Sequence, residues 1–257
     1  MQASVQLAEN EGAPTSQIGY SSTTLAVLLI AVFMTTADNS IVNVAVPSIR
    51  RGLDASGGEL QLVVSGYVLS YGVLLVTGAR LGDLLGYRQV FLGGLFCFTI
   101  ASLACGLAPS VLALIGARFV QGAGAAMMVP QVLSAIQLHF AGRDRVRALG
   151  LYSAALAAGA ATGQALSGLL ISANVLGTTW RPIFLINVPT GIALLGAGFR
   201  RLPPDSGARD GRRLDLAGVA TLSAAIILVA LPLMIGREAG WPAWTWISLA
   251  MAVPARR

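Results

Sequence analysis

The sequence predicts an all-α polytopic membrane protein, because its composition is strongly apolar, its apolar residues form long runs, and its arginines lie between those runs. Of its 257 residues, 55% are hydrophobic and only 11% are charged, whereas soluble domains carry about 25% charged residues. The chain therefore has too little polar material to cover a globule of this size. The same apolar content excludes a disordered chain.

Seven apolar segments each approach the roughly 20 residues that a helix needs to cross a hydrocarbon layer about 30 Å thick. They lie at residues 25–46, 59–79, 90–107, 111–135, 148–172, 183–199 and 216–235. An eighth segment begins after the tryptophan-rich stretch 241–246 and stops at Arg256, too short to cross. Residues 1–22 are polar and lack arginine, so we expect a short disordered tail rather than a signal peptide.

The placement of arginine predicts that the N-terminus lies in the cytoplasm. In that orientation the inside loops carry ten arginines and the outside loops carry four, as the positive-inside rule requires. The inside set is Arg80, Arg88, Arg143, Arg145, Arg147, Arg200, Arg201, Arg209, Arg212 and Arg213, and the outside set is Arg50, Arg51, Arg181 and Arg237. Because these residues do not form one soluble basic face, the net charge of +6 does not indicate a nucleic-acid partner.

The inventory of side chains excludes several kinds of chemistry. All 17 basic residues are arginine, so Schiff-base chemistry and a lysine-containing phosphate loop are both impossible. One histidine and two cysteines are too few for a His/Cys zinc site or an HExxH protease. We therefore expect no metal, no cofactor and no enzymatic activity.

Two charged residues lie well inside apolar segments, Asp38 in the first and Arg118 in the fourth. A charge at membrane depth needs a partner or a watery cavity. At 1.5 Å per residue, Asp38 lies about 12 Å and Arg118 about 10 Å below the outer surface, so the two can pair if their spans are neighbours. Burial disfavours the charged form of Asp38 and a nearby arginine favours it, a balance that suits a proton carrier. The alternative is a static ion pair that fixes helix register, with Arg118 as the counter-charge.

The turn after the second span combines glycines with charged side chains. Gly82, Asp83, Gly86 and Arg88 suit a cytoplasmic latch between helix ends, in which the aspartate caps a helix or pairs with an arginine. A plain charged turn would carry the same residues.

Small and polar residues recur along the fourth and fifth spans, where a spacing of four lets helices approach closely. They are Gln121, Gly122 and Gly124 in the fourth span and Gly159, Gly163 and Gly168 in the fifth. Glycine spacing alone is weak evidence for transport, because any packed pair of membrane helices shows it. Candidates for the lining of a substrate cavity are Asn43, Tyr67, Tyr71 and Gln164, although the two tyrosines also suit simple packing.

Taken together, these motifs resemble the N-terminal half of a major facilitator superfamily transporter of the fourteen-span drug:proton antiporter group. Residues 37–47 resemble the first-span signature of that group, with its aspartate and Val-Asn-Val-Ala-x-Pro. Residues 81–88 resemble the superfamily's loop motif, and the pattern around Arg118 matches the motif implicated in proton transfer. Residues 180–191 resemble the start of the group's sixth span.

The chain also departs from these motifs. In the loop, Ala79 stands for a glycine, and Leu84 and Tyr87 stand for arginines, which removes two charges from the gate. In the fifth span the expected Gly-Pro is Gly163-Gln164 and one glycine is Ser167. The missing proline predicts a less kinked helix.

The resemblance implies proton-coupled export of hydrophobic, often cationic, small molecules such as antibiotics or dyes across a bacterial cytoplasmic membrane. Its partners would be the lipid bilayer, protons and the exported compound, and substrate would lie near the midplane between two six-span halves. In these terms the chain divides into a tail (1–22), a six-span N-terminal transporter bundle (23–199), a cytoplasmic loop (200–215), and a seventh span with a truncated end (216–257).

The length of the chain leaves alternatives open. A fourteen-span transporter needs about twice this length, at about 30 residues for each span and its loop. The chain would then be a truncated half without activity of its own, or a half that works with a separate C-terminal half. An intramembrane enzyme or a structural subunit is a third hypothesis, for which the sequence offers no catalytic cluster.

Overall fold

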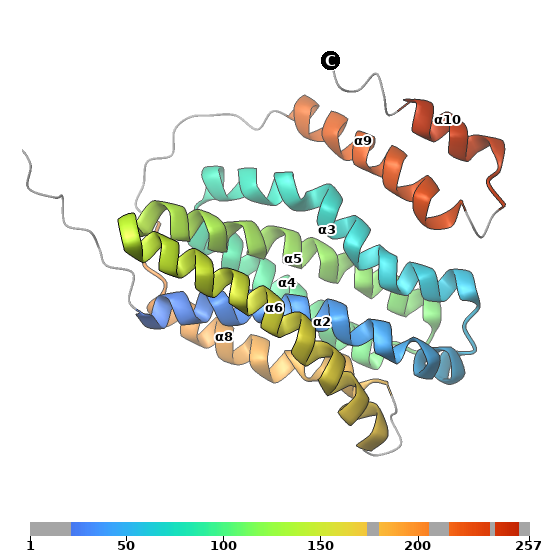
Figure 1. The fold of residues 1–257 in the computed structure, drawn as a ribbon, viewed down its shortest axis with the longest axis horizontal. Coiled ribbons are helices and arrows are strands. Elements are labelled where there is room, and N and C mark those ends of the chain that lie inside the picture. Colours follow the sequence, from blue (N-terminus) through green and yellow to red (C-terminus); the bar gives the residue numbers. More distant parts are fainter. Residues whose placement is uncertain (1–21, 174–179, 206–215, 237–239, 252–257) are drawn as a thin grey trace, which may run out of the picture.

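The computed structural model describes residues 22–173, 180–205, 216–236 and 240–251, which form helices and contain no strand (Figure 1). In chain order the helices are α2 (Ser22–Leu53), α3 (Gly57–Leu85), α4 (Tyr87–Leu107), α5 (Val111–His139), α6 (Gly142–Ala173), α7 (Pro182–Leu185), α8 (Asn187–Arg201), α9 (Leu216–Ile235) and α10 (Ala243–Met251).

Six helical segments among the described residues are long and apolar enough to cross a membrane. They are α2 to α6 and the combined segment Pro182–Arg201, which contains α7 and α8. The predicted all-helical, polytopic architecture is therefore confirmed. The seventh predicted span corresponds to α9 and the short eighth to α10, whereas the predicted tail, apart from Ser22 at the start of α2, lies outside the described residues.

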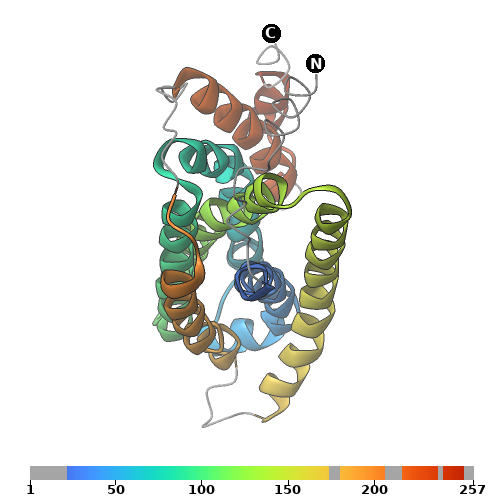
Figure 2. The same ribbon diagram turned by 90° about the vertical axis from the view of Figure 1, so that its left-hand side faces the viewer.

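Helices α2 to α6 and α8 lie side by side in one elongated bundle, as Figures 1 and 2 show from two directions. Helix α9 lies outside this bundle against α3, where the Ser223 hydroxyl donates to the carbonyl oxygen of Val73 over 3.3 Å. Helix α10 packs on α9. The bundle of six predicted spans thus has its own core, and α9 and α10 add to its flank.

Short polar segments fix where the helices begin. Ser56 and Glu59 form a capping box at the start of α3, in which the Glu59 carboxylate accepts from the Ser56 backbone N–H over 2.8 Å. The Ser110 hydroxyl accepts from the Ala113 N–H at the start of α5. Each cap satisfies a backbone donor that a helix start leaves without a partner inside the helix.

Helix α6 packs closely on α2 through small residues spaced four apart. A methyl group at Gly159 would lie 2.6 Å from the Phe33 carbonyl oxygen, and one at Gly163 would collide with the Ala37 carbonyl oxygen. Ser167 continues this row, because its buried hydroxyl donates to the Ile41 carbonyl oxygen over 2.9 Å. The backbones can approach because none of these positions carries a large side chain.

Gly168, expected in the same packing row, lies apart from this contact. A methyl group there would meet nothing within 4 Å. The physical reason is helix geometry, since one residue turns the chain by about 100° and so moves Gly168 off the face that carries Gly163 and Ser167.

Candidate functional site

A buried polar layer crosses the bundle between two apolar clusters. On α2, Asp38 lies between Met34 of one cluster and Ile41 of the other. The corresponding positions on α4, α5 and α8 are taken by Ser102, Arg118, Gln121 and Asn187. Polar groups in such a buried layer are stable only when they are hydrogen-bonded.

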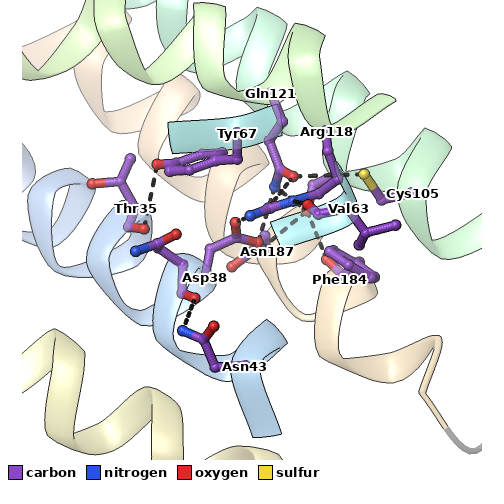
Figure 3. A network of polar contacts seen from close by, with 12 residues as sticks. Thr35, Asp38, Asn43, Val63, Tyr67, Cys105, Arg118, Gln121, Phe184 and Asn187 are labelled. Atoms are coloured by element: carbon purple, nitrogen blue, oxygen red, sulfur yellow. Dashed lines mark hydrogen bonds and ion pairs between the residues drawn. The ribbon is translucent and has the colours of Figure 1, made fainter. Parts of the chain in front are cut away.

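The centre of this layer is an ion pair between Asp38 and Arg118. The Arg118 Nη1 and the Asp38 Oδ2 are 2.6 Å apart, and both side chains are fully buried (Figure 3). The sequence predicted a common depth for the two charges, and the structure brings them together because α5 packs against α2. The guanidinium also donates to Gln121 Oε1 over 2.8 Å and to the Val63 carbonyl oxygen over 3.2 Å.

The second carboxylate oxygen of Asp38 accepts from two amides. Gln121 Nε2 donates to Oδ1 over 2.9 Å, and Asn187 Nδ2 donates to the same atom over 2.6 Å. Both amides also donate to the Ser102 hydroxyl oxygen. Helices α5 and α8 therefore contact the Asp38 carboxylate of α2 directly, and α4 joins them through Ser102.

Asn187 and Ser102 are the members of this layer that sequence reasoning did not select. Asn187 stands in the stretch 180–191 that resembles the sixth-span start, and Ser102 is a polar residue inside an apolar run. A polar side chain in a membrane span usually faces the bundle interior, which was the available signal. The structure buries Ser102 completely and leaves Asn187 only 5% exposed.

The Tyr67 ring lies beneath the Arg118 guanidinium, whose central carbon is 4.4 Å from the ring centroid. This is the geometry of a cation–π contact. The ring also stacks on Tyr71 at 6.3 Å between centroids, and its hydroxyl donates to the Thr35 carbonyl oxygen over 3.5 Å. The structure thus gives Tyr67 a packing role in this state, while Tyr71 is half-buried beside it.

The other two candidate cavity residues lie away from the buried layer. Asn43 is exposed on α2 and donates to the Asn39 carbonyl oxygen of its own helix over 3.2 Å. Gln164 is exposed on α6. The structure does not bring either side chain to Asp38.

Two glycines of the fourth-span motif allow α5 to pack closely on its neighbouring helices at the buried polar layer. A methyl group at Gly122 would collide with the Tyr67 carbonyl oxygen of α3, and one at Gly124 would lie 2.6 Å from the Phe98 nitrogen of α4. Helix α5 is therefore held tightly against both α3 and α4, which positions Gln121 and Arg118.

The expected cytoplasmic loop is mostly helical. Gly82 and Asp83 belong to α3, and only Gly86 separates α3 from α4. Its φ of 103° lies in the region that a residue with a Cβ avoids, so glycine permits the sharp break. The Asp83 carboxylate does not cap a helix here. It accepts from the Tyr87 hydroxyl over 2.8 Å, and its other oxygen lies 4.0 Å from the Arg80 guanidinium, which is the expected pairing with an arginine.

The start of α4 is capped by Asp205, a residue that sequence reasoning did not select. Its carboxylate accepts from the backbone N–H groups of Arg88 and Gln89, over 2.9 and 3.4 Å. The Arg88 guanidinium donates to the Phe199 carbonyl oxygen over 2.8 Å. A methyl group at Gly86 would collide with the Asp205 carboxylate. These contacts join the break between α3 and α4 to the end of α8.

Comparison with known proteins decides the family. The sequence profile of the Major Facilitator Superfamily matches residues 28–255. The chain belongs to the Major Facilitator Superfamily. This is a family of membrane transporters and not of enzymes, which accords with the multi-span fold. Among the described residues, moreover, no group of three or more His, Cys, Asp or Glu side chains gathers as metal ligands would.

Curated members of the superfamily resemble the chain over most of its length. It is 39% identical over 223 residues to a protein named "Probable actinorhodin transporter" from Streptomyces coelicolor, and covers 38% of that protein. It is 39% identical over 242 residues to "Cephamycin export protein CmcT" from Amycolatopsis lactamdurans, and covers 48% of it. The alignments include 87% and 93% of this chain. The chain thus spans less than half the length of either relative.

Among solved superfamily structures, the chain resembles a bacterial homologue of the human lysosomal transporter Spinster in an inward-facing, occupied conformation. The TM-score is 0.65 at 20% identity, and the match covers 92% of this chain and 58% of the other. At that identity the likeness shows the shared fold alone.

Proposed function

We propose that residues 23–199 form the N-terminal bundle of a proton-coupled exporter of hydrophobic, often cationic, small molecules in a bacterial cytoplasmic membrane. The names of the two superfamily relatives, one an export protein for cephamycin and one a probable transporter of actinorhodin, support export. The excess of arginine in alternate loops supports a cytoplasmic N-terminus.

The observation that carries the proton coupling is the fully buried ion pair of Asp38 and Arg118. With Asp38 charged, the two charges cancel. A proton on Asp38 would leave the Arg118 charge uncompensated at membrane depth, where an unpaired buried ion costs several kcal/mol. Uptake of a proton therefore favours another arrangement of α2 and α5, in which Arg118 meets water or a new partner. A single proton can drive a conformational step in this way.

We further propose that transport requires a C-terminal bundle in addition to this one, since alternating access is the movement of one half against the other. The chain covers 38% and 48% of its two relatives, which supports this requirement. On this proposal the chain alone confers no resistance, and growth of a host on a toxic substrate would contradict it.

The test uses inside-out membrane vesicles from bacteria that express the chain with the C-terminal half of a full-length relative. A proton gradient is imposed, ethidium uptake is followed by fluorescence, and vesicles with either half alone serve as blanks. We expect Asp38→Asn to abolish gradient-driven uptake, because the amide cannot take up a proton in exchange. Unchanged uptake would rule out Asp38 as the proton carrier.

Asp54→Asn provides the matched control. Asp54 is exposed between α2 and α3, with a φ of 50° that asparagine tolerates. The same chemical change there removes one acid without touching the buried layer, so uptake should match the unmodified chain.

A further inference from the structure

Ser102 occupies the middle of the buried polar layer, where it is fully buried on α4. Its hydroxyl oxygen lies 3.0 Å from Asn187 Nδ2 and 3.2 Å from Gln121 Nε2. It also lies 2.9 Å from the carbonyl oxygen of Phe184. Ser102 therefore touches three groups and links α4 to α5, α7 and α8.

The chemistry of a hydroxyl fixes the direction of these three hydrogen bonds. A serine hydroxyl has one hydrogen and two acceptor lone pairs. The Phe184 carbonyl oxygen can only accept, so it takes the single hydrogen. Both lone pairs then face the amides, and Gln121 and Asn187 must each turn an NH₂ group toward Ser102.

The same two NH₂ groups contact Asp38. Gln121 and Asn187 both donate to its Oδ1, while Arg118 donates to its Oδ2. All three side chains therefore donate hydrogen bonds to Asp38, which stabilises its charged form. A protonated carboxyl group is itself a donor and needs an acceptor, which this arrangement does not offer at either oxygen.

Proton uptake therefore requires an amide to turn its oxygen toward Asp38. Asn187 is the candidate, because Gln121 would lose the bond that its oxygen accepts from Arg118. While the Ser102 hydrogen is held by Phe184, such a turn would place the amide oxygen against a lone pair of Ser102. If Phe184 moves away, the hydroxyl hydrogen is free to point at the turned amide. The bond from Ser102 to Phe184 thus opposes protonation, and its release permits it.

Phe184 lies on the short helix α7, which precedes α8 in the chain. Helix α7 has four residues and is separated from α8 at Ile186. Besides Ser102, α7 is joined to α4 at Gly106, whose carbonyl oxygen accepts from Arg181 over 2.8 Å, and where Leu185 packs on the glycine. A shift of α7 along α4 would break these contacts together.

We propose that Ser102 is a positioning residue for proton uptake, which holds Asp38 in its charged form for as long as the hydroxyl donates to Phe184. The inference rests on the proposed role of Asp38 as the proton carrier. It adds that movement of α7 away from Ser102 decides when Asp38 can take up a proton.

The test is a pH titration of Asp38 by infrared spectroscopy on the purified 257-residue chain in detergent. The carbonyl stretch of the protonated carboxyl group is assigned to Asp38 by its absence from Asp38→Asn. Ser102→Ala removes the hydroxyl that keeps the Asn187 NH₂ group turned toward Asp38, while the Gln121 oxygen stays bound to Arg118. We expect the titration midpoint to rise by about one pH unit, the difference between a hydrogen bond to a charged group and one to a neutral group. This readout needs neither transport nor a second bundle.

Thr99→Val is the control, because Thr99 is buried one turn away on α4 and its hydroxyl donates only to Leu95 of the same helix. We expect it to titrate like the unmodified chain. A second variant, Ser102→Cys, keeps a side chain of similar size but offers only a weak donor and a weak acceptor. It should raise the midpoint in the same direction, which keeps the test decisive if Ser102→Ala does not fold.

The outcomes separate the two proposals. If Asp38 titrates in the unmodified chain and neither Ser102→Ala nor Ser102→Cys raises its midpoint, the role of Ser102 is refuted and the proton carrier stands. An equal rise in Thr99→Val also refutes it, because packing alone would then explain the change. If the Asp38 band does not change with pH in the unmodified chain, the proposed proton coupling fails, and the role of Ser102 fails with it.

Discussion

Removal of Arg118 alone should strongly destabilise the bundle. In Arg118→Met the side-chain volume is largely kept, but Asp38 loses its counter-charge, and the oxygens of Gln121 and Val63 each lose one donor. Breaking a buried ion pair from one side costs about 3–5 kcal/mol. The Arg118 contact with Tyr67 is lost as well, so we expect the upper part of that range.

The double variant Asp38→Asn/Arg118→Met should recover at least about 2 kcal/mol of this loss, because no unpaired charge then remains. The single variant should also recover stability at mildly acidic pH, where a proton neutralises Asp38. The free energy of unfolding is measured by titrating the chain in mixed micelles with sodium dodecyl sulfate and following helix content by circular dichroism.

Arg143→Met is the control for this measurement, since Arg143 is exposed in the first turn of α6. It should stay within about 0.5 kcal/mol of the unmodified chain. The reasoning is refuted if Arg118→Met costs under about 1 kcal/mol, or if the double variant is no more stable than the single one.

Two further changes probe packing and capping in the same unfolding assay. Gly163→Ala places a methyl group against the Ala37 carbonyl oxygen and should lower the free energy of unfolding by about 1–3 kcal/mol. Gly168→Ala meets open space and should be neutral or slightly stabilising. Equal effects of the two changes would contradict the close α2–α6 contact at Gly163. Asp205→Ala removes the cap of α4 and should cost about 1 kcal/mol. Asp144→Ala, a change at an exposed acid, should lower the free energy of unfolding by less than Asp205→Ala does. A larger loss for Asp144→Ala would refute the capping role of Asp205.

Much of the fold could be predicted because long apolar runs in a bilayer have few structures open to them. A spanning segment must satisfy its own backbone, which makes helices the outcome. The first five predicted spans each fall within one observed helix, the sixth runs across α7, Ile186 and α8, and α9 has the predicted bounds. The predicted loop after the second span was wrong in extent, because α3 continues through Asp83 to Leu85 and glycine is needed only at residue 86.

The composition of the site was only partly predictable. Depth along a helix follows from residue count, so the sequence could place Asp38 and Arg118 at one level. The direction of a side chain around the helix does not follow from that count. Tyr67 therefore suited both a cavity and a packing role, and the structure places its ring under Arg118.

By itself, the sequence determined that the chain spans the membrane with helices, that two opposite charges share one depth, and that small residues let helices approach. Those properties follow from hydrophobicity, rise per residue and side-chain size, which are local. Only the tertiary structure decided that Asn187 binds Asp38, that Ser102 binds the Asn187 amide, and that Asp205 caps α4. The physical reason is that hydrogen bonds between distant segments depend on how the helices rotate and pack against one another.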